Sequence, residues 1–210
     1  MKKTELDKRT LPIDVQEVGV VQYPYDIDKE FEFIKKMDYE PANELKEDGN
    51  DKNLDARVRT TVDKFILYRP EFKKLYEFFQ DQLDNYVKHI LGSEKILKIG
   101  SSWVAMMEHG QWTEPHTHIS IVNGCFYVNV PDDKTPLILD TYNCLNERED
   151  FTIPIKEKDL VLWDNELSHW VPENTNKETR YALAFSTISE SEFEHHITLT
   201  NSYNKHYGKK

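Results

Sequence analysis

The feature that most constrains this chain is a change in hydrophobic period at Gly100. Between Pro70 and Gly92, apolar residues recur three and four positions apart, which predicts a helix with one buried face. After Gly100 the apolar residues alternate with a period of two, as at Trp103, Ala105 and Met107. The two halves therefore predict different secondary structure, helical before Gly100 and extended after it.

The second half contains seven or eight short strand-like segments, separated by turn residues and with no helical pattern between them. This arrangement is typical of an antiparallel sandwich or jelly roll. The segments are Ser101–Met107, Ile119–Val130, Pro136–Asp140, Phe151–Ile155, Leu160–Trp163, Ser168–Val171, Tyr181–Thr187 and, as a possible eighth, His195–Thr200.

The first half predicts a helical layer that supports this double sheet. We expect a short strand at 18–21, a helix over 27–34 with Asp26 as its cap, and an exposed polar loop over 38–58. The predicted organisation is therefore a helical support region at 1–98, a β core at 99–200 and a tail at 201–210.

Charge and composition narrow the partners and the compartment. The chain has 27 basic and 38 acidic residues, a net charge of −11, which disfavours nucleic acid as a partner. No uncharged apolar run approaches the ~20 residues of a membrane helix, and the N-terminus does not resemble a secretory signal. Two cysteines cannot form a disulfide framework, so we expect a cytoplasmic protein.

Three histidines in the β region are candidate metal ligands. His116 and His118 form a His-x-His pair, which places both imidazoles on one face of a strand. By itself such a pair is weak evidence for a metal site, and a polar surface strand is the better interpretation. In a jelly roll, however, His169 on a late strand can converge with the pair, and Arg180 follows 11 residues later at the start of the next strand.

Several runs of residues together resemble a family of Fe(II)/2-oxoglutarate-dependent oxygenases that is common in marine bacteria and phages. The resemblance spans roughly residues 62–187 and implies a double-stranded β-helix. The matching runs are Ser102-Trp103-Val104, His116-Thr117-His118, the strand from Asn123 to Pro131, the run from His169 to Asn174, and Arg180.

The resemblance implies that His116 and His169 are iron ligands and that Arg180 binds the distal carboxylate of 2-oxoglutarate. A guanidinium suits that role because it pairs bidentately with a carboxylate and stays protonated. Tyr127 and Asn129 share a strand face, and either could hydrogen-bond the co-substrate. A core aromatic is the alternative interpretation of Tyr127.

The resemblance leaves the identity of the third iron ligand open. The wider superfamily uses two histidines and one carboxylate, whereas this sequence has a second histidine at the expected carboxylate position. We favour His118 as the third ligand, with Asp140 and Glu114 as the carboxylate alternatives.

The resulting prediction is an iron- and 2-oxoglutarate-dependent dioxygenase that uses molecular oxygen to hydroxylate a small molecule or a peptide side chain. One alternative is a three-histidine cupin-type dioxygenase, in which Arg180 holds a substrate carboxylate and 2-oxoglutarate has no role. The other is a jelly roll that binds a metal or carbohydrate without catalysis.

Overall fold

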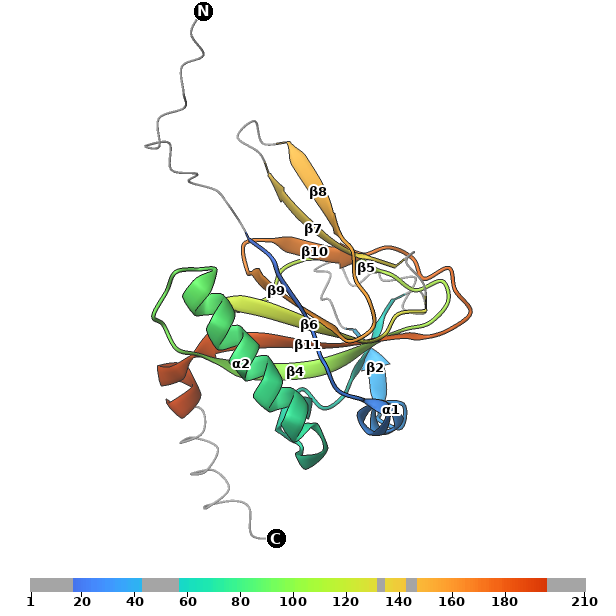
Figure 1. Cartoon of the computed structure of the whole chain (residues 1–210). Helices are drawn as coiled ribbons and strands as arrows, with labels where there is room; N and C mark the ends of the chain where they lie inside the picture. Colours follow the sequence, from blue (N-terminus) through green and yellow to red (C-terminus); the bar gives the residue numbers. More distant parts are fainter. Residues whose placement is uncertain (1–16, 43–56, 132–134, 143–146, 196–210) are drawn as a thin grey trace, which may run out of the picture.

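The computed structural model describes residues 17–42, 57–131, 135–142 and 147–195, which form two sheets flanked by helices (Figure 1). The larger sheet has seven strands in the order β1-β9-β6-β11-β4-β3-β2, and the smaller has four in the order β5-β10-β7-β8. Every pairing between these strands is antiparallel. The chain is therefore mainly β with a jelly-roll architecture, as the alternating pattern predicts.

In the second half of the chain, β6 to β11 lie within three residues of the predicted segments, whereas β4 begins before Gly100 and β5 was not among the predicted segments. The strands are β1 Gly19–Gln22, β2 Tyr39–Pro41, β3 Arg59–Thr61, β4 Leu97–Met107, β5 Thr113–His116, β6 Val122–Asn129, β7 Leu137–Tyr142, β8 Arg148–Ile153, β9 Asp159–Asp164, β10 Ser168–Val171 and β11 Arg180–Ser189. The helices are α1 Asp28–Ile34 and α2 Lys73–His89, with short 3-10 helices η2 Ile66–Tyr68 and η3 Pro70–Phe72. A further helical segment covers 190–195, at the end of the described residues.

The larger sheet has two different faces because successive side chains of a strand point to opposite sides. On β6, Phe126 and Val128 belong to the core that α2 covers, whereas Cys125 and Tyr127 belong to the core between the two sheets. Figure 1 shows α2 crossing one face of the larger sheet, with the smaller sheet on the other side. The space between the two sheets is where a site can form.

Helix α2 occupies the segment that the helical period predicts. Its buried residues are Leu75, Phe79, Leu83, Tyr86 and Val87, at the spacing of a single face. The first turn after Pro70 is a 3-10 helix, so the α-helix itself begins at Lys73. None of the helices in the described part of the chain combines the length and the apolar character that crossing a bilayer requires.

The first half of the chain is less helical than its sequence predicts. Three N-terminal strands join the larger sheet: β1 pairs with β9, and the β2–β3 pair extends the sheet beyond β4. The predicted exposed loop over 38–58 is therefore wrong at Tyr39–Pro41, which is strand β2. The possible strand His195–Thr200 lies outside the described residues except for His195, which is helical.

Gly124 on β6 allows the sheet and α2 to pack together. It lies opposite Phe185 of β11, whose ring stacks on Phe79 of α2 with ring centroids 5.7 Å apart. A Cβ atom on Gly124 would lie 2.1 Å from Cζ of Phe185. No side chain fits at position 124 while Phe185 keeps its place.

We therefore expect Gly124→Ala to destabilise the fold by about 2 kcal/mol or more, because overfilling a packed core forces its neighbours to move. Urea unfolding measures this change. Gly100→Ala is the matched control, since its Cβ would meet Ile188 only at 3.3 Å. Equal stability of the two variants would contradict the close packing described for Gly124.

Candidate metal centre and cavity

The pairing of β5 with β10 brings two distant histidines face to face. His116 ends β5, and its direct cross-strand partner is His169 of β10. Their ring centroids lie 4.2 Å apart, and the ring of His118 lies 4.9 Å from His116 and 5.0 Å from His169. One ligand atom from each of the three lies within 4.8 Å of the others, which is a spacing that one metal ion can bridge.

The ring orientations are set by neighbouring groups. Nδ1 of His116 lies 2.7 Å from the carbonyl oxygen of Glu114, so this nitrogen donates to the backbone and Nε2 is left for a metal. The ring of Trp163 packs against His169 at 5.0 Å, and the ring of Trp103 packs against His118 at 5.2 Å. Two tryptophans thus hold the cluster from the side of the larger sheet.

Burial keeps two of the imidazoles neutral. It lowers the pKa of His118 to about 4, with a smaller contribution from nearby His116. Burial also lowers the pKa of His169 well below its usual value, and His116 and His118 lower it further. A histidine binds metal only through a neutral imidazole, so His118 and His169 are in the ligating form at neutral pH.

The two carboxylates considered as alternative ligands lie elsewhere. Oδ2 of Asp140 lies 3.3 Å from Nε of Arg148, and Oε1 of Glu114 lies 3.8 Å from a guanidinium nitrogen of Arg57. Within the described ranges, the group that could hold a metal consists of the three histidines alone. His118 follows the end of β5 instead of lying on it, and the strand runs through Pro115.

A cavity of about 510 Å³ opens beside the histidines and is lined from both sheets. Arg180 lines it while being only 2% exposed, and its Cζ lies over the ring of Tyr127 at 5.1 Å. Nε of Arg180 and the hydroxyl of Tyr127 are buried and have no hydrogen-bond partner among the described residues. Such groups are costly when unpaired, so this end of the cavity is built to bind an acceptor, above all an anion.

Tyr127 can act there as a hydrogen-bond donor. Complete burial raises the pKa of its hydroxyl well above the usual value, although Arg180 opposes the shift. The phenol is therefore protonated at neutral pH and presents its O–H beside the Arg180 guanidinium.

Asn129 does not reach the cavity in this structure. Its Nδ2 donates to the carbonyl of Thr179 at 2.9 Å, and its Oδ1 accepts from the backbone N–H of Tyr181 at 2.8 Å. These two partners are the residues immediately before and after Arg180, so the Asn129 side chain anchors the start of β11.

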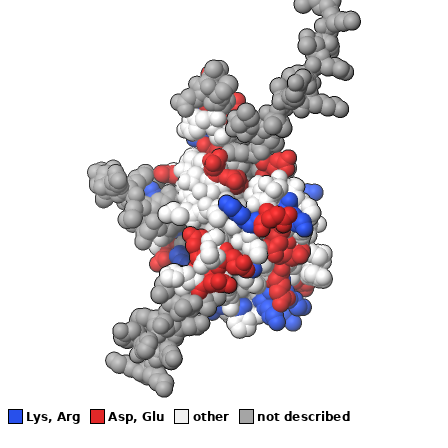
Figure 2. All heavy atoms as spheres, turned by 90° about the vertical axis from the view of Figure 1, so that its left-hand side faces the viewer, with Lys and Arg blue, Asp and Glu red and all other residues white. Residues whose placement is uncertain are grey.

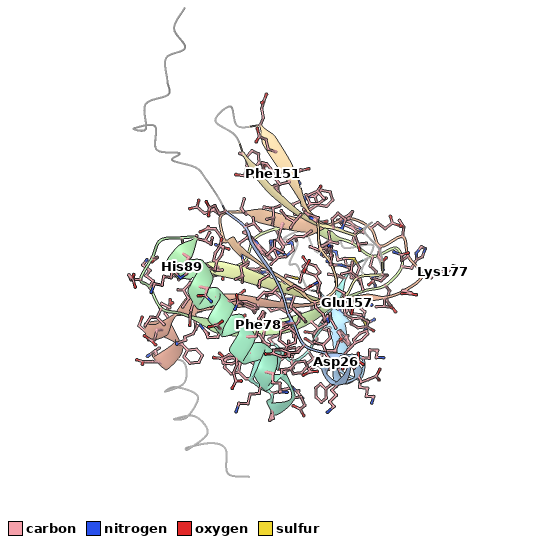
Figure 3. The ribbon with its side chains drawn as sticks, viewed as in Figure 1. Asp26, Phe78, His89, Phe151, Glu157 and Lys177 are labelled. Atoms are coloured by element: carbon pink, nitrogen blue, oxygen red, sulfur yellow. The ribbon has the colours of Figure 1, made fainter. Side chains whose placement is uncertain are left out.

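The cavity also contains residues that the sequence did not single out as site residues. Asn123 shares the cavity face of β6 with Tyr127, so strand alternation could have revealed it. Three more lining residues come from β2, β3 and the turn after β3: Glu40, Thr60 and Lys64. The sequence of these short segments shows no recognisable hydrophobic period. His89, in contrast, lies at the far end of α2 (Figure 3).

Comparison with known proteins agrees with this geometry. A family model described as "Putative 2OG-Fe(II) oxygenase" matches residues 101–186. No protein with a curated description matches the chain.

Solved structures share the fold at low sequence identity. The non-heme alpha ketoglutarate dependent epimerase SnoN from nogalamycin biosynthesis superposes with a TM-score of 0.61 at 13% identity, covering 82% of this chain and 78% of that one. A prolyl hydroxylase from Trichoplax adhaerens, solved with a peptide fragment, gives 0.58 at 15%, covering 83% and 84%. A Pseudomonas putida prolyl-4-hydroxylase gives 0.54 at 16%, covering 81% and 92%.

The matched segment contains all three clustered histidines and Arg180. In its jelly-roll sheets and in this matched segment, the chain is similar to the 2OG-Fe(II) oxygenases.

Proposed function

We propose that this protein is an Fe(II)- and 2-oxoglutarate-dependent oxygenase that hydroxylates a small molecule or a peptide side chain. The observation that carries the proposal is that the three-histidine cluster and the buried Arg180 line one cavity. Molecular oxygen is the second co-substrate. The free, buried Cys125 is consistent with a reducing, cytoplasmic location, which we include in the proposal.

The donor set fits the proposed metal and co-substrate. Iron would be held by His116, His118 and His169, since imidazole nitrogen is a good ligand for Fe(II). The distal carboxylate of 2-oxoglutarate would be held by Arg180 and Tyr127, whose unpaired N–H and O–H groups would gain acceptors. When bound, the metal would activate molecular oxygen, which is the oxidant: one oxygen atom would enter succinate as 2-oxoglutarate loses CO2, and the other would enter the substrate.

The protein's own contribution is orientation and charge. Three neutral imidazoles leave the charge of the metal at +2, and the two carboxylates of 2-oxoglutarate cancel it. With the positive charge of Arg180 added, the net charge of the metal, the co-substrate and this side chain is about +1. Burial of Arg180, Tyr127 and His169 keeps water away from the reacting centre.

The identity of the third ligand is tested by comparing His118→Ala with Asp140→Asn. We expect His118→Ala and His169→Ala to weaken Fe(II) binding by more than the roughly 10–100-fold typical of losing an outer-shell partner. Asp140→Asn is expected to keep wild-type affinity, because Asp140 pairs with Arg148 away from the cluster. Anaerobic calorimetry with Fe(II) measures the affinities. Loss of binding in Asp140→Asn and its retention in His118→Ala would favour the carboxylate instead.

Arg180→Ala is expected to weaken 2-oxoglutarate binding about 10- to 100-fold, because a hydrogen bond to a charged group is lost, while Fe(II) binding remains. In an anaerobic titration, a visible absorption band that needs both Fe(II) and 2-oxoglutarate reports the complex. A wild-type protein that binds iron tightly but forms no band would contradict 2-oxoglutarate dependence and favour the cupin-type dioxygenase.

We expect Tyr127→Phe to weaken 2-oxoglutarate binding without lowering the stability of the ligand-free protein. The variant loses a donor to the co-substrate, so the 2-oxoglutarate Kd rises about tenfold. It also removes a buried hydroxyl that has no partner among the described residues, so the ligand-free protein is as stable as the wild type or more so. Thermal unfolding with and without 2-oxoglutarate measures both effects. A destabilised ligand-free variant would show that the hydroxyl already has a partner.

A further inference from the structure

The larger sheet presents a continuous row of residues across the cavity. Strand pairing places Glu40 of β2 opposite Thr60 of β3, Thr60 opposite Ala105 of β4, Ala105 opposite Ala182 of β11, and Ala182 opposite Tyr127 of β6. All five line the cavity. Since neighbouring strands are about 4.8 Å apart, the row spans roughly 19 Å.

The co-substrate groups occupy one end of this row. The guanidinium of Arg180 lies over Tyr127, on the β6 side, and Trp163 of the neighbouring β9 packs against His169. On the opposite side, Trp103 of β4 packs against His118. The histidine cluster therefore lies between two halves of the cavity. One half contains the anion-binding groups Arg180 and Tyr127. The other half lies over β4, β3 and β2 and is lined by Ala105, Thr60 and Glu40; we call it the β2–β4 half.

Small side chains create the space between these ends. Ala105, Ala182 and Ala184 all line the cavity on the two central strands, where larger residues would fill it. The hollow leads from the histidines across β4 toward Glu40.

Glu40 is the group at the far end that can receive a ligand. Nζ of Lys64 lies 2.9 Å from Oγ1 of Thr60, 2.6 Å from the carbonyl oxygen of Thr61 and 3.3 Å from Oε1 of Glu40, which uses all three of its N–H groups. Oε2 of Glu40, in contrast, has no hydrogen bond or ion pair with any described residue, and the side chain is 45% exposed.

We propose that the β2–β4 half is the substrate site and that its substrate is an elongated organic cation, bearing an ammonium or guanidinium group that binds Glu40. This inference rests on the proposed function. Because Lys64 already pairs with Oε1 of Glu40 at 3.3 Å, the cationic end would bind through the other oxygen, Oε2. The positive charge left beside the histidines repels this end and leaves an aliphatic C–H group near the cluster.

The acidic surface of the protein is compatible with a cationic substrate. The net charge is −11, which favours the approach of cations. Figure 2 shows groups of carboxylates interrupted by Lys and Arg on one face, and the described residues there form no continuous basic stripe.

The test uses the full-length protein with Fe(II) and 2-oxoglutarate under anaerobic conditions. The probes are L-lysine, L-arginine and putrescine, with L-norleucine as the counterpart of lysine that lacks the side-chain ammonium group, and the readout is a shift of the visible band. We expect at least one cation to bind, L-norleucine to bind at least about tenfold more weakly than L-lysine, and Glu40→Gln to remove this difference.

Two further variants control for the position of the change. Glu77→Gln alters an exposed carboxylate of α2, on the other face of the sheet, and is expected to bind the probes as the wild type does. Ala105→Leu fills the hollow, so it should abolish probe binding.

The outcomes separate this inference from the proposed function. If the wild type forms no band, the proposed function fails and the inference fails with it. If the band forms but no cation shifts it, or L-norleucine binds as well as L-lysine, or Glu40→Gln changes nothing, the oxygenase proposal stands and the cationic substrate is wrong.

Discussion

The site depends on the antiparallel pairing of β5 with β10. Residues 53 positions apart in sequence, His116 and His169, become direct neighbours only because these two strands are in this register. A slip of one residue would turn one imidazole to the opposite face of the sheet. The hydrogen bond between Nδ1 of His116 and the carbonyl of Glu114 then fixes the ring, so strand register and ring orientation together define the candidate metal centre.

Most of the second half could be predicted because most of its strands are long enough to show a period, whereas β5, with four residues that include Pro115, was not among the predicted strands. Helix α2 was equally readable, since its buried residues repeat at helical spacing over 17 residues. Strands β2 and β3 were missed because each has only three residues, which is too short for a recognisable alternation. Their structure comes from pairing with β4, a tertiary interaction that a local pattern does not contain.

The site was predictable where chemistry coincides with strand alternation. The three histidines and Arg180 are rare residue types at informative positions, and the structure brings all four to one cavity. Asn129 shows the limit of this reasoning. An ideal strand would put it on the same face as Tyr127, but the β6–β11 register shifts between Tyr181 and Ala182, and its amide binds backbone instead. Glu40 was not predictable because its strand was not.

The two faces of the larger sheet separate what holds the molecule together from what it recognises. Residues packed under α2, such as Phe126 and Leu183, do not share their face with Ala105, Ala182 or Tyr127. Residues on the cavity face can therefore change while the side chains packed between the sheet and α2 keep the same total volume. Because of this separation, the same architecture can acquire new substrate specificities without losing its core. Such divergence would give proteins that share the fold at low sequence identity, as the solved structures do at 13–16%.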